Sequence, residues 1–173
     1  MGDADRPTAG EDASNLRGVL ALSGVLLLLF LARMLMSPLL VAIQSAYELT
    51  HTQAGALFLS LSRLSSVITL LSGFVARSLH HRRTVALSLG ISGAALMVLS
   101  SAPALPVFYA MVTIVGVGAG LYMPSGVSML TGTASEHHWG KGIAIHELGA
   151  IAGFFLAPLI AQAALQFGSW RSE

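Results

Sequence analysis

Long uninterrupted runs of apolar residues constrain this sequence more than any other feature. Such runs recur along the chain, and the few charged side chains within them stand alone, as Arg33 and Arg63 do. A helix of ~20 apolar residues crosses a hydrocarbon core of ~30 Å. The apolar residues are continuous rather than alternating, which favours helices over a barrel of strands. The sequence therefore predicts an all-α fold, a polytopic membrane helix bundle.

Five membrane-spanning helices are expected. Residues 1–16 are polar and of mixed charge, which predicts a disordered cytoplasmic tail, and residues 17–173 form the membrane domain. Short links join the helices, so consecutive helices should be antiparallel neighbours. The predicted helices cover residues 17–46, 52–78, 84–101, 106–130 and 141–167.

Composition excludes several classes of protein. Only 10% of the residues are charged, against about 25% in soluble domains. The chain has no cysteine, which rules out disulfides and thiolate metal sites, and its net charge of +1 gives no reason to expect nucleic acid as a partner. There is no G-x-x-x-x-G-K-[ST] phosphate loop, so ATP use is not expected, and neither is enzymatic activity or a bound cofactor.

The distribution of Lys and Arg predicts the orientation. Six cations precede the first helix or lie in the second-to-third and fourth-to-fifth links, whereas the opposite side has Arg171 alone. Cytoplasmic loops carry the excess of Lys and Arg. We therefore expect a multi-pass protein of the plasma membrane with a cytoplasmic N-terminus.

The segment 116–130, "GVGAGLYMPSGVSML", combines glycines with a proline and polar side chains. Gly116 and Gly120 form a G-x-x-x-G pair, which allows close approach of two helices; Gly149 and Gly153 form a second pair. Pro124 predicts a kink inside the span. Tyr122 and Ser125 place polar atoms near this kink, as expected for a helix that lines a water-filled cavity.

These segments resemble the N-terminal half of a major facilitator superfamily transporter. The family pattern "GxGxGxYxPS" resembles residues 116–125, and "GIAIHELGAIAGFFLAPLIA" resembles its fifth helix, with Pro158 near the outer end. "SWR" at residues 169–171 is similar to the entry into a sixth helix. The loop signature G-x-x-x-D-R-x-G-R-R falls on Gly73 and on the "HHRR" of residues 80–83. The glycine and the basic end, with Arg82 and Arg83, survive, whereas Arg77 stands at the acid and His80 at the second glycine.

The resemblance implies a solute carrier of twelve helices, in which two halves enclose a central site reached by alternating access. The first and fourth helices of this half would line the cavity. The sequence ends where a sixth helix would begin, so we expect truncation before or within that helix. The missing second half or an oligomeric partner would then complete the site. The alternative is a non-transporting membrane protein, or an inactive fragment, that dimerises or serves a partner.

Arg33 and Arg63 lie within spans, each about eleven residues from the outer end of its helix, or ~16 Å deep. A charge at this depth costs ~2.5–3.5 kcal/mol on insertion scales, so it needs a partner or a purpose. Two cations at one level suit a solute that bears a carboxylate or a phosphate. The alternative is that either arginine pairs with carbonyls or with an acid of the second half.

His146 and Glu147 lie five or six residues into the fifth predicted helix. The zinc-protease pattern H-E-x-x-H fails, because Ala150 stands at the second histidine. Two readings remain open. In the first, the pair is a proton relay, and its protonation is linked to the side on which the cavity is open. Otherwise Glu147 interacts with the positive helix N-terminus and His146 bonds a neighbouring helix. The histidine pairs at 80–81 and 137–138 are expected to be solvated rather than to bind a metal.

Overall fold

The computed structural model describes residues 9–101, 104–133 and 138–167. The predictions for residues 1–8, His137 and the "SWR" segment at 169–171 fall outside these ranges. The described residues form helices and turns without a strand. The helices are α1 (Ala9–Met34), α2 (Leu40–Tyr47), α3 (His51–Leu79), α4 (His81–Ser100), α5 (Leu105–Thr133) and α6 (Trp139–Phe167).

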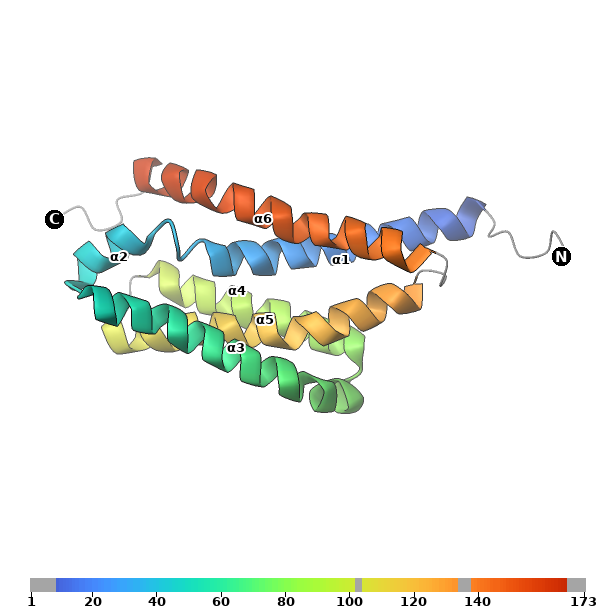
Figure 1. The fold of residues 1–173 in the computed structure, drawn as a ribbon, viewed down its shortest axis with the longest axis horizontal. Helices are drawn as coiled ribbons and strands as arrows, with labels where there is room; N and C mark the ends of the chain where they lie inside the picture. Colours follow the sequence, from blue (N-terminus) through green and yellow to red (C-terminus); the bar gives the residue numbers. More distant parts are fainter. Residues whose placement is uncertain (1–8, 102–103, 134–137, 168–173) are drawn as a thin grey trace, which may run out of the picture.

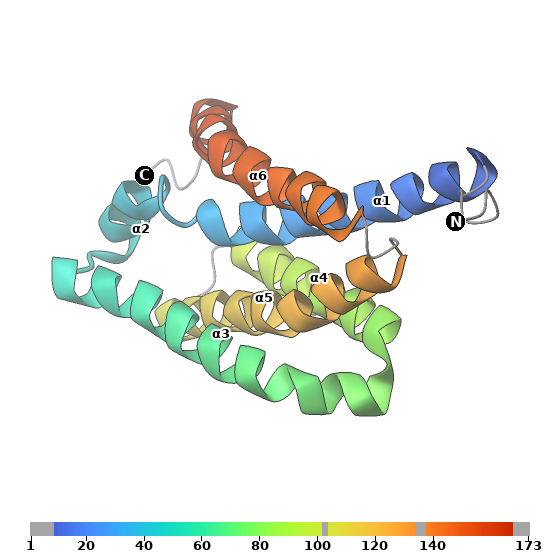
Figure 2. The ribbon, with the colours of Figure 1, turned by 45° about the vertical axis from the view of Figure 1, so that its right-hand side comes forward.

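Five helices are long and apolar enough to cross a membrane, which confirms the predicted helical membrane bundle. They contain the spans Asn15–Met34, His51–Leu79, His81–Ser100, Leu105–Thr133 and Trp139–Gln166. Their links are short, so successive spans run antiparallel. Figures 1 and 2 show them side by side along one long axis.

The first predicted helix is divided in the structure. We expected one helix over 17–46, but α1 ends at Met34 and α2 starts at Leu40. Pro38 causes the break, because it has no N–H to donate to the carbonyl of Met34. The N–H of Ser37 donates to that carbonyl instead, at 3.1 Å, in a tighter turn. At its other end α1 begins at Ala9, inside the expected tail, since no proline interrupts residues 9–17.

Two turns fix where α3 begins and where α4 follows it. Thr50 caps α3 reciprocally with Gln53, its hydroxyl accepting from the Gln53 N–H while the Gln53 side chain accepts from the Thr50 N–H. His80 separates α3 from α4 with φ 63° and ψ 146°. Residues with a Cβ rarely adopt this backbone conformation, which glycine adopts freely. The turn between α3 and α4 therefore carries a strained histidine.

The helices form two groups that meet along α5 (Figure 1). In the first group α5 packs extensively on both α3 and α4, and in the second α6 packs on α1. Contacts between α1 and α5 join the groups. The start of α1, the turn between α3 and α4, the end of α5 and the start of α6 all lie at one end of the bundle (Figure 1). The link cations used for the orientation therefore belong to the same end.

Glycines set the closest helix contacts. A Cβ added at Gly116 would lie 2.5 Å from the carbonyl oxygen of Leu61, and one at Gly120 would lie 2.5 Å from that of Ser65. Both contacts join α5 to α3. Gly149 and Gly153 lie in the same way against the backbone of α1, at Ser23 and Leu27. Both G-x-x-x-G pairs thus stand where two backbones approach closely.

Most Ser and Thr hydroxyls in the spans donate to a carbonyl of their own helix three or four residues earlier. This arrangement satisfies a polar group in hydrocarbon without a partner on another helix. The hydroxyls that do so belong to Ser23, Ser60, Ser66, Thr69, Ser72, Thr84, Ser88, Ser100, Thr113, Ser128, Thr131 and Thr133.

Candidate solute and proton sites

A cavity of about 390 Å³ lies between α1, α3 and α5. Its walls are mostly apolar, with a small number of polar groups, as is usual for small-molecule sites. The lining residues are Leu26, Leu29, Phe30 and Arg33 of α1, Ser65, Ser66, Thr69 and Leu70 of α3, and Ala119, Tyr122 and Met123 of α5.

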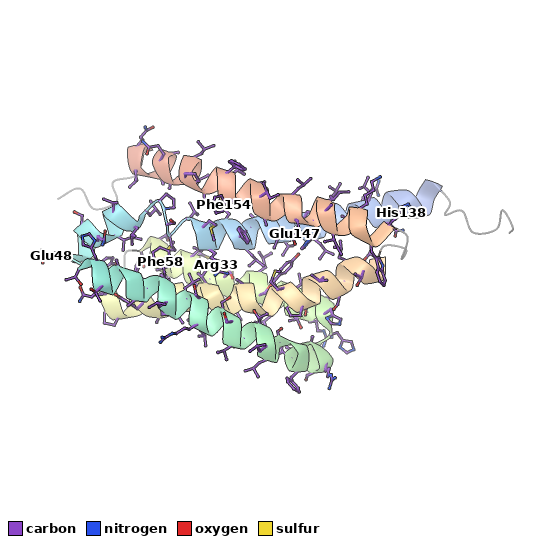
Figure 3. The ribbon with its side chains drawn as sticks, viewed as in Figure 1. Arg33, Glu48, Phe58, His138, Glu147 and Phe154 are labelled. Atoms are coloured by element: carbon purple, nitrogen blue, oxygen red, sulfur yellow. The ribbon has the colours of Figure 1, made fainter. Side chains whose placement is uncertain are left out.

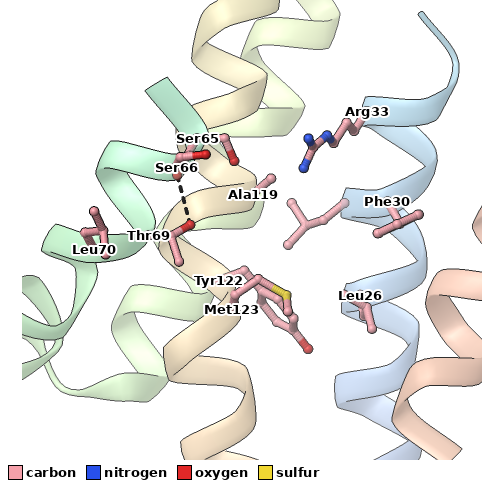
Figure 4. A pocket seen from close by; sticks show the side chains of 11 residues that line it. Leu26, Phe30, Arg33, Ser65, Ser66, Thr69, Leu70, Ala119, Tyr122 and Met123 are labelled. Carbon is pink, nitrogen blue, oxygen red and sulfur yellow. Dashed lines mark hydrogen bonds between the residues drawn. The ribbon is translucent and has the colours of Figure 1, made fainter. Parts of the chain in front are cut away.

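Arg33 is the cation of this cavity. It reaches from α1 toward the turn of α3 that bears Ser65, Ser66 and Thr69 (Figure 4). The hydroxyls of Ser66 and Thr69 donate to carbonyls of their own helix, at 3.0 and 2.8 Å. A hydroxyl engaged in this way still has lone pairs that can accept a hydrogen bond. The guanidinium, with its several N–H donors, therefore faces a wall of hydroxyls across open space.

Two of the predicted cavity residues lie elsewhere. Arg63 is exposed and does not line the cavity. It is two residues from Ser65, and two helical residues differ by ~200° in direction, so Arg63 projects from the opposite face of α3. Ser125 is fully buried on α5, where its hydroxyl lies 3.3 Å from Nδ1 of His81 at the start of α4.

The Tyr122 side chain joins three helices at the floor of the cavity. Its ring lines the cavity from α5, and its hydroxyl donates to the carbonyl oxygen of Leu22 on α1 at 2.8 Å. The same hydroxyl lies 2.8 Å from Nε2 of His146 on α6. Both Tyr122 and His146 are buried, so these bonds are shielded from water.

Glu147 lies beside this network. Its Oε1 is 3.5 Å from Nδ1 of His146, and its side chain is 49% exposed, whereas that of His146 is 1% exposed. This separation permits an ionic contact if the ring is protonated, but the geometry is not that of a hydrogen bond, and Nδ1 has no hydrogen-bond partner among the described residues. Figure 3 places Glu147 on α6 nearer to the start of that helix, away from Arg33. The buried ring of His146 thus lies next to the carboxylate of Glu147, which is accessible from outside the bundle.

Small residues let the three helices meet at this point. A Cβ at Gly126 would lie 2.6 Å from the Tyr122 ring, so this glycine leaves room for the ring one turn earlier. On α6, Gly149 brings the backbone against Ser23 of α1. The Ser23 hydroxyl, which donates to Val19 at 2.8 Å, also lies 3.3 Å from the carbonyl oxygen of Ile145. His146 is therefore held against α1 by its immediate neighbours.

The other residues predicted to pack or gate take varied places. Pro124 and Pro158 lie inside α5 and α6. Gly73 is exposed, and a Cβ there would meet no described atom within 4 Å. Arg82 and Arg83 are exposed in the first turn of α4.

Sequence reasoning missed the hydroxyl wall of α3 and the role of Gly126. Ser65, Ser66 and Thr69 share one face of a helix, at spacings of three and four residues, and this periodicity within an apolar span is a signal that could have found them. The room that Gly126 leaves for Tyr122 carries no such signal, since it depends on the ring's orientation. In the described part of the chain, no group of three His, Cys, Asp or Glu side chains is arranged to hold a metal.

The spanning helices and the cavity define a multi-pass membrane protein. Residues 22–173 match the model of the Major Facilitator Superfamily, and the chain belongs to this family of membrane transporters. No match was found among curated proteins or among solved structures.

Proposed function

We propose that this protein is a secondary transporter that moves a small solute across the plasma membrane by alternating access. The observation that carries the proposal is the cavity in which Arg33 faces the hydroxyls of Ser65, Ser66 and Thr69. A partly buried cation that faces open space inside a transporter can serve as a ligand for the solute.

The solute is proposed to carry a negative charge. The cavity offers the guanidinium of Arg33 and the hydroxyl groups of α3, and guanidinium binds carboxylate or phosphate through paired hydrogen bonds. Apart from Tyr122, the remaining walls come from Leu, Phe, Met and Ala side chains, which accommodate an apolar body. Arg63 has no part in this portion of the site. Its exposed position on α3 suits a contact with a second helical unit, from the same polypeptide or from an oligomeric partner.

A proton gradient is proposed as the driving force, with Glu147 and His146 as the coupling pair. Support comes from the 3.5 Å contact between His146 Nδ1 and Glu147 Oε1, which becomes an ion pair when the ring is protonated. Histidine changes charge near neutral pH, within the range that gradients span. The location of the cationic loops at one end of the bundle supports a cytoplasmic N-terminus.

Uptake into proteoliposomes tests this function. The chain is reconstituted with an inward proton gradient, and small labelled monocarboxylates are compared with their neutral amides, with protein-free liposomes as the blank. We expect carboxylate uptake that collapses when an ionophore dissipates the gradient. If neither carboxylates nor amides accumulate under the gradient, the proposal fails, and a membrane protein that serves a partner becomes the better reading.

A further inference from the structure

The hydrogen atoms around Tyr122 can be counted. Its oxygen lies 2.8 Å from the carbonyl oxygen of Leu22 and 2.8 Å from Nε2 of His146. Each of these short contacts needs one hydrogen. The carbonyl has none, and the hydroxyl has one, which it donates to Leu22. The hydrogen between Tyr122 and His146 must therefore be carried by Nε2 of the ring.

This count assigns the tautomer of His146. With Nε2 protonated, Nδ1 carries a lone pair in the neutral ring, and it is the sole position where a second proton can add. Nδ1 is buried and lacks a hydrogen-bond partner among the described residues. It lies 3.5 Å from Oε1 of Glu147. The proton therefore arrives at the atom that faces the carboxylate.

The charged and titratable groups near His146 come from few elements. On α6 the ring contacts Glu147, and on α5 it contacts Tyr122. The neighbouring residues of α1, Leu22 and Ser23, are neutral. Arg33 stands eleven residues after Leu22 on α1, or ~16 Å along that helix.

We propose that Tyr122 is a positioning residue for proton uptake, which fixes His146 in the Nε2–H form and so directs the proton to Nδ1 beside Glu147. This inference rests on the proposed function and deepens it. The proton adds to the Nδ1 lone pair, no bond at Nε2 is broken, and the ring becomes an imidazolium whose charge is balanced by the carboxylate of Glu147. Glu147 is half exposed, so its carboxylate is the group beside the buried Nδ1 through which a proton from outside the bundle can arrive.

Tyr122 also connects this proton site to the solute. Protonation turns the bond from Nε2 to the Tyr122 oxygen into a charge-assisted one, which is shorter and stronger. The ring of Tyr122 lines the same cavity as Arg33. A solute that contacts the ring and a proton on Nδ1 therefore influence one side chain, and such coupling acts equally in both directions.

Nitrogen NMR of the whole chain tests the tautomer directly. The protein is labelled with ¹⁵N in its histidine rings, placed in phosphatidylcholine–phosphatidylglycerol bilayers and studied from about pH 5 to 8; a His146→Gln sample identifies the signals. We expect the neutral ring to carry its hydrogen on Nε2 alone, and any further proton to add at Nδ1. A neutral ring protonated at Nδ1 would overturn the proposal.

Tyr122→Phe keeps the aromatic ring and removes the hydroxyl. Both neutral tautomers should then appear for His146, and the pH profile of uptake should shift. Tyr109→Phe is the matched control, because the Tyr109 hydroxyl also joins α5 to a backbone carbonyl, that of Gln53 on α3, at 2.7 Å. It should leave the His146 signals and the pH profile unchanged. A Tyr122→Phe protein with the wild-type tautomer and profile refutes the assignment. If that variant does not fold, the wild-type spectrum decides alone.

The spectrum needs no solute, so its outcome is separate from that of the uptake assay. The expected signals without any gradient-driven uptake would refute the proposed function and retain the positioning role of Tyr122. Gradient-driven uptake by a protein whose neutral His146 is protonated at Nδ1 would support the proposed function and refute the positioning role of Tyr122.

Discussion

The cavity beside Arg33 and the contact around His146 both place ionisable side chains inside membrane-spanning helices, but their surroundings differ. Arg33 is partly exposed and faces open space with hydroxyls on the far wall. His146 is fully buried where α1, α5 and α6 meet, with one ring nitrogen bonded and the other beside a carboxylate. The first arrangement leaves a charge available to a ligand. The second makes a charge acceptable only together with the anion of Glu147.

The largest effect on uptake is expected from a substitution at Glu147, beside His146, and it distinguishes the proton site from the cavity. Glu147→Gln removes the anion that balances a protonated His146 while preserving the shape of the side chain, so we expect gradient-driven uptake to be lost. Solute exchange without a gradient should remain, since the cavity is intact. Glu48→Gln is the control, because Glu48 is exposed at the end of α2 and does not line the cavity. Unchanged pH-dependent uptake by Glu147→Gln would end the coupling hypothesis.

A smaller effect is expected in the cavity. Arg33→Ala should weaken the apparent affinity for an anionic solute about tenfold or more, because a hydrogen bond to a charged group contributes ~1.5–3 kcal/mol. A neutral analogue should lose less, and Arg33→Lys should recover part of the difference. Concentration dependence of uptake measures both. Arg63→Ala, on the opposite face of α3, is the comparison; equal losses for the charged and the neutral solute in Arg33→Ala would exclude an anion site.

The packing that encloses His146 predicts a change in stability. Gly149→Ala places a Cβ against the backbone of Ser23, and overpacking of this kind costs ~1–3 kcal/mol. Thermal unfolding in detergent should therefore occur at a lower temperature. Gly73→Ala adds the same methyl group where no described atom lies within 4 Å, and it should not destabilise the protein. If the two variants unfold alike, α1 and α6 are not in close contact at Gly149.

The smallest expected effect lies outside both regions, at the turn between α3 and α4. His80→Gly relieves the strain of a positive φ of 63°, and strain of this kind costs ~1–3 kcal/mol. Because glycine loses more conformational entropy on folding than histidine does, we expect a net stabilisation of about 1 kcal/mol or less. His80→Ala retains the Cβ and should give no gain. Thermal unfolding compares them, and equal stability of both variants would show that the turn is not strained by its Cβ.

The helical bundle could be predicted because long apolar runs determine it locally. The division of the first helix at Pro38 was missed, since a proline inside a span can bend a helix or end it, and the sequence does not distinguish these outcomes. The sequence did not distinguish Arg33 from Arg63, because counting residues gives only the depth of each arginine in its span, and the two depths are similar. The direction of each side chain depends on which face of its helix is buried, and Arg63 points away from the face of α3 that packs on α5.

The hydrogen bond between Tyr122 and His146 had no local signal at all. The two residues are 24 positions apart, and their meeting depends on the approach of α6 to α1 at Gly149 and on the room left by Gly126. The sequence indicated that His146 and Glu147 needed an explanation, but it could not indicate which neighbour would supply one.

The Ser and Thr hydroxyls that donate within their own helices bear on how this molecule can move. When one helix slides or tilts against another, none of these bonds is broken. The hydrogen bonds at risk are those between helices, at points such as Tyr109–Gln53, Thr113–Ser60 and Tyr122–Leu22. The resistance of the bundle to rigid-body rearrangement is therefore concentrated at a few places. Tyr122 is one of them, so movement of α1 and α6 relative to α3, α4 and α5 requires the hydrogen bond of the Tyr122 hydroxyl to Leu22 to break.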